Sequence, residues 1–89
     1  MVHYMVRMRK GAVQIRFEIL EFLYYNPKLQ LRTYIWRRAT NLSYDDFLRH
    51  LTYLKERKLV EETIDGCCRL TGEGRRIYTE LRKSLPSIM

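Results

Sequence analysis

The dipeptide Asp65-Gly66 lies between two short runs of β-forming residues, in a chain whose other apolar residues mostly have helical spacing. Asp-Gly supplies the positive φ that a tight hairpin turn needs. The sequence therefore predicts strands at 59–64 and 67–70, joined by a two-residue turn. One hairpin among several helices limits the fold to the α+β class, mainly α.

Two stretches before the hairpin have the spacing of amphipathic helices. The first covers residues 10–25 and ends at Asn26-Pro27, because a residue before proline is displaced from the α region. The second is a short helix at 31–39. Its apolar face is expected to consist of Leu31, Ile35 and Ala39.

A third helix is predicted to begin after Ser43, because a serine hydroxyl caps helix N-termini well. Asp46 stands where a carboxylate can reach back to the Ser43 backbone N–H and lies in the positive first turn. This helix ends near Lys58. Its buried side carries Phe47, Leu51 and Leu54, and its opposite side carries Asp45, Arg49, Thr52, Tyr53 and Glu56.

The chain is expected to form one domain at 10–85, preceded by a separate segment at 1–9 and followed by a tail at 86–89. Thr71 is placed to cap a last helix at 72–84, in which apolar residues repeat every four positions. Residues 1–9 alternate apolar and polar side chains, which favours a strand. The alternative is a basic arm that becomes ordered only on a partner.

Charge narrows the possible functions. The chain has 17 Lys and Arg against 10 Asp and Glu, a net charge of +7 on 89 residues. A chain of this length buries only about 60 to 65% of its unfolded surface, enough for one small core. No apolar stretch approaches the roughly 18 residues of a membrane span, so we expect a soluble, intracellular protein. Positive excess on such a domain is typical of a protein that binds phosphate backbones.

Residues that carry chemistry are few. Cys67 and Cys68 are adjacent and are expected to point to opposite faces, one buried and one exposed, with an intermolecular disulfide as an alternative. Only His3 and His50 add possible ligands, so we expect no metal and no cofactor. His50 is expected to be a partly buried structural residue. No nucleophile, base and orienting acid share a segment, and we therefore expect no enzyme.

The order helix, short helix, turn, capped helix, hairpin, helix is that of a winged helix-turn-helix. The residues Ala39-Thr40-Asn41-Leu42-Ser43-Tyr44 and the junction Arg57-Lys58-Leu59-Val60-Glu61-Glu62 resemble the archaeal winged helix-turn-helix family of small dimeric DNA-binding proteins. This family includes transcriptional regulators, chromatin-associated proteins and versions encoded by archaeal viruses. The resemblance implies a three-helix core, a β-hairpin wing and a C-terminal helix. It also implies a cytoplasmic homodimer, in an archaeal cell or an infected host, that binds double-stranded DNA.

The resemblance assigns the reading of DNA bases to the third helix. Arg49 is the first candidate, because an arginine fork fits guanine O6 and N7. The other base-reading candidates are Tyr44, Asp45, Thr52 and Tyr53, and the phosphate candidates are Arg32, Thr33, Arg37 and Ser43. Arg69 is the candidate wing contact, with a cross-strand pair to a glutamate as its alternative. Candidate dimer contacts are Phe22, Tyr25, Ile77, Tyr78 and Leu81.

Three features depart from the family pattern. Asp45 and Asp46 open the third helix, where acidic groups repel phosphates, although Asp46 has a capping role. Three acidic residues in the hairpin region against Arg69 argue against minor-groove insertion. Lys58 stands where winged helices usually have glycine, and we expect the helix to end differently, because left-handed non-glycine residues cost about 1 kcal/mol or more. Two alternatives stay open: non-specific chromatin-type binding, and a protein-binding adaptor using Trp36, Leu48 and Tyr53.

Overall fold

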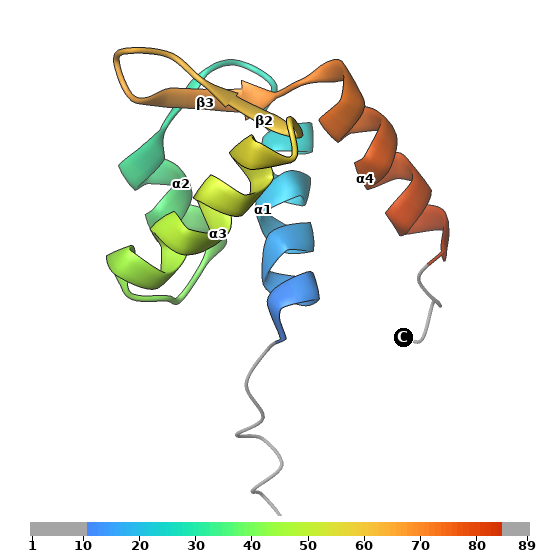
Figure 1. The fold of residues 1–89 in the computed structure, drawn as a ribbon, viewed down its shortest axis with the longest axis horizontal. Coiled ribbons are helices and arrows are strands. Elements are labelled where there is room, and N and C mark those ends of the chain that lie inside the picture. Colours follow the sequence, from blue (N-terminus) through green and yellow to red (C-terminus); the bar gives the residue numbers. More distant parts are fainter. Residues whose placement is uncertain (1–10, 85–89) are drawn as a thin grey trace, which may run out of the picture.

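The computed structural model describes residues 11–84 (Figure 1). In chain order the elements are α1 (Ala12–Tyr25), β1 (Gln30–Leu31), α2 (Arg32–Ala39), α3 (Tyr44–Glu56), β2 (Val60–Glu62), β3 (Cys67–Leu70) and α4 (Gly72–Ser84). The mainly helical α+β fold with a hairpin after the third helix is confirmed. The predictions for residues 1–9 and for the tail at 86–89 lie outside the described residues.

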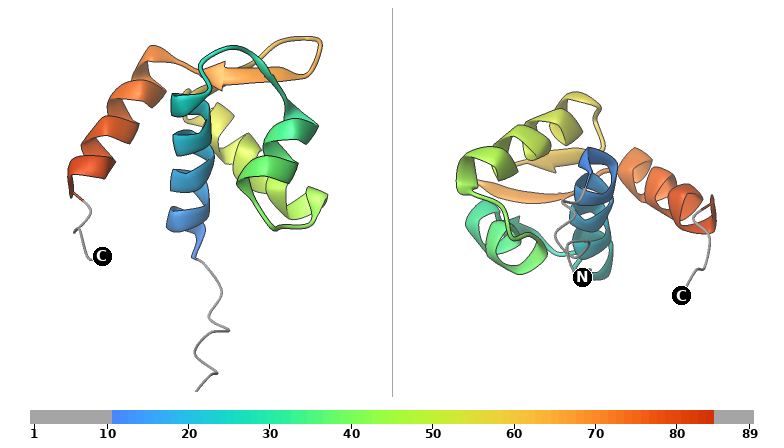
Figure 2. Two further views of the ribbon diagram at one scale, coloured as in Figure 1. Left: turned by 180° about the vertical axis from the view of Figure 1, so that it is seen from behind. Right: turned by 90° about the horizontal axis from the view of Figure 1, so that it is seen from below.

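α1 is the central helix. It packs against α2, α3 and α4, and all views show α4 on the side of α1 away from α2 and α3 (Figures 1 and 2). A small antiparallel sheet with strand order β1-β3-β2 covers one end of these helices (Figure 1). The sheet therefore fixes the hairpin relative to the helix-turn-helix formed by α2 and α3.

β1 was not predicted from the sequence. Leu31 was expected on the apolar face of α2, but it lies in β1, opposite Cys67 of β3, and is exposed. α2 begins one residue later, at Arg32, whose backbone N–H donates to the Gly66 carbonyl at 2.9 Å. Pairing with β3 holds the chain before α2 extended, and this long-range contact outweighs the local helical pattern.

The hairpin turn has three residues, at 64–66, rather than the predicted two. The Gly66 N–H donates to the Thr63 carbonyl at 3.0 Å, and the Thr63 N–H donates to the Cys67 carbonyl at 2.8 Å. Gly66 has a φ of 82°, whereas Asp65 does not have a positive φ. A two-residue Asp-Gly turn needs positive φ at both positions, so the chain forms a three-residue loop closed by a left-handed glycine.

α3 ends in a Schellman motif with Lys58 in the left-handed conformation, at a φ of 64°. The Leu59 N–H donates to the Leu54 carbonyl and the Lys58 N–H donates to the Lys55 carbonyl, both at 2.9 Å. This is the usual hydrogen-bond pair of the motif, in which glycine is the common left-handed residue. The expectation that Lys58 makes the helix end differently is therefore wrong, because these hydrogen bonds stabilise the strained residue.

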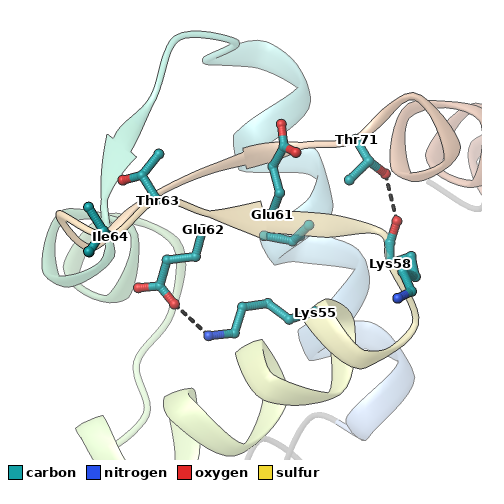
Figure 3. Close-up of a pocket in the computed structure, with 8 residues that line it drawn as sticks. Lys55, Lys58, Glu61, Glu62, Thr63, Ile64 and Thr71 are labelled. Atoms are coloured by element: carbon teal, nitrogen blue, oxygen red, sulfur yellow. Dashed lines mark hydrogen bonds and ion pairs between the residues drawn. The ribbon is translucent and has the colours of Figure 1, made fainter.

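Thr71 joins the end of α3 to the beginning of α4. Its hydroxyl donates to the Lys58 carbonyl at 2.7 Å (Figure 3), and its oxygen accepts from the Gly74 N–H at 2.9 Å. The predicted cap is confirmed. The two segments lie so close that a Cβ on Gly74 would stand 2.0 Å from the Leu59 carbonyl oxygen. Glycine at this position is thus a requirement of packing.

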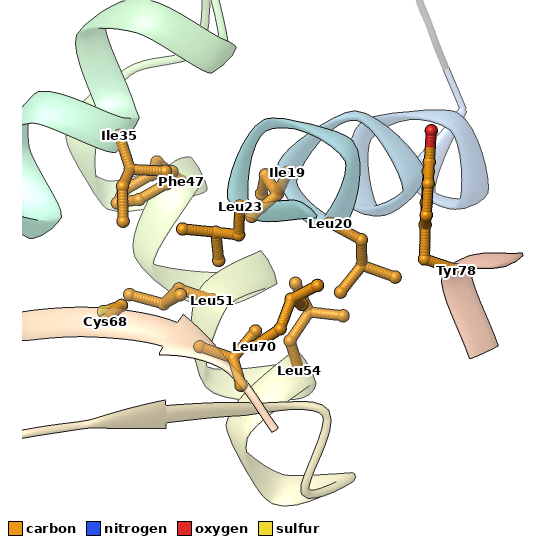
Figure 4. Close-up of a cluster of buried hydrophobic side chains, with 11 residues drawn as sticks. Ile19, Leu20, Leu23, Ile35, Phe47, Leu51, Leu54, Cys68, Leu70 and Tyr78 are labelled. Atoms are coloured by element: carbon orange, nitrogen blue, oxygen red, sulfur yellow. The ribbon is translucent and has the colours of Figure 1, made fainter. Parts of the chain in front are cut away.

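The core is formed by apolar side chains from the helices and from the hairpin strands (Figure 4). The predicted buried faces of α2 and α3 are confirmed at Ile35, Phe47, Leu51 and Leu54. The complete buried set is Ile19, Leu20, Leu23, Ile35, Phe47, Leu51, Leu54, Val60, Cys68, Leu70 and Tyr78. This core fixes which side of α3 faces outward.

Candidate nucleic-acid interface

The outer face of α3 is accessible along its whole length. Asp45, Arg49, Thr52 and Glu56 are exposed on the side opposite the core, as a rotation of 100° per residue requires. The helix begins at a capped N-terminus, where the Ser43 hydroxyl oxygen accepts from the Asp46 N–H at 3.2 Å. Three base-reading candidates of the sequence therefore share one exposed surface.

Arg49 is the most accessible cation of this surface, with 73% of its side chain exposed. Its guanidinium donates to the Asp46 carboxylate one turn earlier. The sequence had suggested that the Asp46 carboxylate accepts from the Ser43 backbone N–H. In the structure it accepts from Arg49 instead. Exposed ion pairs of this spacing contribute only about 0.5 kcal/mol, so the pair restrains Arg49 only weakly.

The two tyrosine candidates flank the outer face and do not project from it. Tyr44 is half-buried, edge-on to Trp36 with ring centroids 5.0 Å apart. Tyr53 is half-buried beneath the guanidinium groups of Arg16 and Arg57. Trp36 is also half-buried, and its indole N–H donates to the Leu42 carbonyl at 2.7 Å. The exposed Trp36 and Tyr53 that the adaptor alternative assumed are not found.

α2 is basic and carries no acidic residue. Thr33 and Arg37 are exposed, as expected of phosphate contacts. Arg38, which the sequence analysis did not select, is exposed beside Arg37 with its guanidinium 5.7 Å from the Tyr34 ring centroid. The sequence signal that would have found Arg38 is the absence of acidic residues from this segment.

Arg32, the remaining candidate on α2, is held by Glu62 of β2. Its Nη1 lies 3.0 Å from Glu62 Oε2, while Lys55 Nζ of α3 lies 2.5 Å from Glu62 Oε1 (Figure 3). The Glu62 side chain is only 11% exposed, and its charge raises the pKa of Arg32. Glu62 therefore joins the wing to both helices of the helix-turn-helix, and Arg32 has a structural contact in this conformation.

The wing has little free positive charge. Arg69 stands directly opposite Glu61 in the β2–β3 register, with Nε and Oε2 2.6 Å apart. This is the cross-strand pair that the sequence analysis left as the alternative to a DNA contact. A groove of about 460 Å³ runs along β2 and the end of α3, and Ile64 at the wing tip is 98% exposed.

The candidate dimer contacts on α1 and α4 differ in accessibility. Tyr25 is 55% exposed, and Phe22, Ile77 and Leu81 are half-buried. Tyr78 is fully buried in the protomer, where its hydroxyl donates to Glu21 Oε2 at 3.2 Å. Selecting Tyr78 was wrong, because the packing of α4 on α1 leaves its ring no surface for a second subunit.

His50 on α3 and the Cys68 thiol on β3 also have shifted pKa values. Burial, and then the nearby Arg16 charge, lower the pKa of His50. Burial raises the pKa of the Cys68 thiol to about 11, while Cys67 beside it is half-buried. Within residues 11–84, no three His, Cys, Asp or Glu side chains lie close enough to share a metal ion.

Comparisons with known proteins agree with this architecture. The sequence model of the winged helix-turn-helix family matches residues 9–86. The crystal structure of AF1382 from Archaeoglobus fulgidus is similar in fold, with a TM-score of 0.68, 22% sequence identity and 91% of each chain covered. The sequence has no match among curated proteins.

Three further observations bear on the class of protein. No described helix has the length and apolar content to cross a membrane. Winged helix-turn-helix domains are typically DNA-binding and not enzymatic, with the second helix of the motif placed in the major groove. The family match extends from before α1 to beyond α4. The chain therefore belongs to the winged helix-turn-helix family.

Proposed function

We propose that the protein is a sequence-specific double-stranded DNA-binding protein, a transcriptional regulator that acts as a homodimer with α3 in the major groove. The observation that carries this proposal is the outer face of α3, where Asp45, Arg49 and Thr52 are exposed together on a helix anchored by the core. Its site of action is the cytoplasm, where the DNA of an archaeal cell or of its virus is accessible.

Each side chain on this face has a contact that suits its chemistry. Arg49 donates both arms of its fork to guanine O6 and N7, after leaving the weak pair with Asp46. Asp45 accepts from cytosine N4, and Thr52 contacts a base edge. Tyr44 and Tyr53, at the flanks of the face, contact sugars beside the groove.

Phosphate contacts come mainly from α2. Arg37 and Thr33 are exposed and have no ion-pair partner within residues 11–84. Ser43 adds the capped N-terminus of α3, where backbone N–H groups favour anions. Arg32 contributes only after it separates from Glu62. Arg69 contributes only after it separates from Glu61, so we assign the wing a minor role.

A salt series with paired variants tests the reading surface. Arg49→Ala and Arg37→Ala each remove one exposed arginine, from α3 and α2 respectively. Affinity for a selected site and for random duplex is measured by fluorescence anisotropy. Arg49→Ala is expected to lower affinity for the selected site by about 1–3 kcal/mol, or roughly 5- to 150-fold, and random-duplex affinity much less. Arg37→Ala is expected to weaken both alike and to reduce the salt slope by about 0.9.

The outcomes separate the competing functions. Equal losses on every sequence from Arg49→Ala refute its role in base reading. Salt-dependent binding without preference for any sequence supports the chromatin-type alternative. Undetectable DNA binding below about 100 mM salt refutes the DNA proposal and leaves the protein-binding adaptor.

The dimer is proposed to form through α1 and α4, with Tyr25, Phe22, Ile77 and Leu81 at the contact. A two-fold pair places its reading helices about 34 Å apart, which predicts a palindromic site. Sedimentation velocity of Tyr25→Glu is expected to show monomers, whereas Ile64→Glu at the exposed wing tip is expected to leave the dimer intact. A monomeric wild-type protein contradicts the dimer, and a dimeric Tyr25→Glu variant contradicts the contact.

A further inference from the structure

The flank of α3 that faces α1 carries two arginines and a histidine gathered around one tyrosine. The Arg16 guanidinium lies 3.6 Å from the centroid of the Tyr53 ring, and that of Arg57 lies 4.9 Å from it. Arg16 Nε also donates to His50 Nδ1 at 3.2 Å. We call Arg16, His50, Tyr53 and Arg57 the Tyr53 cluster.

Within residues 11–84, no carboxylate forms an ion pair with an arginine of the Tyr53 cluster. Among residues 11–84, ion pairs occupy five other cations: Arg32, Arg49, Lys55, Arg69 and Arg76. Arg16 and Arg57 have no acidic partner in this part of the chain and instead lie over the Tyr53 ring. Stacking on a ring occupies the face of a guanidinium and leaves N–H groups at its edge for an anion.

His50 adds a further donor. Because its Nδ1 accepts from Arg16, the neutral imidazole carries its proton on Nε2. Burial, and then Arg16, lower the pKa of His50; Arg49 also lowers it, and Asp46 opposes them. The imidazole is therefore neutral near pH 7 and donates through Nε2, so it does not need to be charged to bind an anion.

The cluster continues the reading surface along α3. Arg49, Tyr53 and Arg57 follow each other at intervals of four residues, so they form one row along the helix. Arg49 belongs to the outer face proposed to read bases. Tyr53 and Arg57 lie toward the C-terminal end of α3. A nucleic-acid strand read by Arg49 would thus pass its backbone close to the cluster.

We propose that Arg16, His50 and Arg57, held around Tyr53, form a phosphate-binding site on the flank of α3. Guanidinium forks match the oxygens of a phosphate in geometry and charge. The phosphate belongs either to the backbone of bound DNA or to a free phosphate-bearing ligand. We assign it to the DNA backbone, and this assignment rests on the proposed function.

A matched pair of variants tests the DNA assignment. Arg57 and Arg75 are both exposed arginines over a tyrosine ring, at 4.9 Å from Tyr53 and 5.2 Å from Tyr24 respectively. Arg57→Gln and Arg75→Gln therefore remove the same charge and the same kind of contact, at the C-cap of α3 and on α4. In a salt series with duplex DNA, Arg57→Gln is expected to weaken binding several-fold and to reduce the slope by about 0.9. Arg75→Gln is expected to leave the slope unchanged.

A second arm tests the site without DNA. Inorganic phosphate and pyrophosphate are titrated at constant pH and ionic strength, while NMR follows the imidazole resonances of His50. The site predicts a saturable shift that Arg57→Gln and Arg16→Gln abolish and that Arg75→Gln retains. The amide spectra of the variants show whether each is folded, and Arg57→Lys is expected to recover part of the binding.

The two arms distinguish failure of this site from failure of the proposed function. If the wild-type protein does not bind DNA, a saturable His50 shift still supports a phosphate site, with a free ligand as its occupant. If Arg57→Gln and Arg75→Gln have the same salt slope of DNA binding, but the His50 resonances of the wild-type protein still shift with phosphate, the occupant of the site is a free ligand and not the DNA backbone. The inference is overturned if the His50 resonances do not shift with phosphate and, in addition, either the two variants have equal salt slopes or the protein does not bind DNA.

Discussion

The left-handed residue at the end of α3 provides a direct test of the fold. Lys58 has a φ of 64°, and its backbone is held by the Schellman hydrogen bonds and by the Thr71 hydroxyl. Its exposed side chain has no ion pair within residues 11–84. Replacing Lys58 with glycine therefore removes a steric cost and loses no described side-chain contact.

The expected gain follows from two opposing terms. A left-handed non-glycine residue costs about 1–2 kcal/mol. Glycine recovers this but makes the unfolded chain more flexible, at a cost of about 0.5–1 kcal/mol. Lys58→Gly should thus raise the free energy of unfolding by about 0.5–1 kcal/mol, and Tm by about 2–8 °C for a domain of this size.

Urea denaturation followed by circular dichroism measures this change, with Lys58→Ala as the matched control. Alanine removes the same charge and the same long side chain but keeps the left-handed strain. We expect it to be close to the wild-type protein in stability. If Lys58→Gly is no more stable than Lys58→Ala, the strain assigned to this position is absent and the reasoning is wrong.

Three further predictions follow from the packing. Gly74→Ala should lower the free energy of unfolding by at least about 1 kcal/mol, because the new Cβ would stand 2.0 Å from a backbone carbonyl oxygen. This cost outweighs the better helix propensity of alanine. Gly72, where a Cβ would have open space, is the control, and Gly72→Ala should not be destabilising in the same urea assay. His50 has a lowered pKa in the folded state, so the unfolded chain takes up the proton first, and stability should fall as pH decreases below about 6.5; a pH series in which His50→Gln shows the same decline contradicts this. Iodoacetamide at pH 8 should label Cys67 and leave Cys68, whose thiol pKa burial raises to about 11; mass spectrometry showing equal labelling in the folded protein would refute it.

Much of the fold could be predicted because it depends on local patterns. Ser43 and Thr71 cap their helices where the sequence placed them, since capping needs only a hydroxyl a few residues from an N–H. Phe47, Leu51 and Leu54 are buried, since their spacing places them on one face. The exposure of Arg49 follows from the same periodicity.

The candidate site was harder to predict, because contacts across the chain determine which charges are free. Arg32 was expected at phosphates, but Glu62, thirty residues later, holds it. Arg69 has an equivalent pair with Glu61. Arg16 was not selected at all, and only the packing of α1 on α3 brings it to Tyr53.

The sequence by itself determined that this chain forms helices with caps at defined residues, a hairpin, and a basic second helix beside an outward-facing third. These properties are local, since they depend on spacing, capping and composition over a few residues. The tertiary structure decided the turn length, the need for glycine at 74, the burial of Tyr78 and the ion pairs that join distant segments, such as Arg32–Glu62. Those properties depend on which segments meet in space, and no local pattern encodes that meeting.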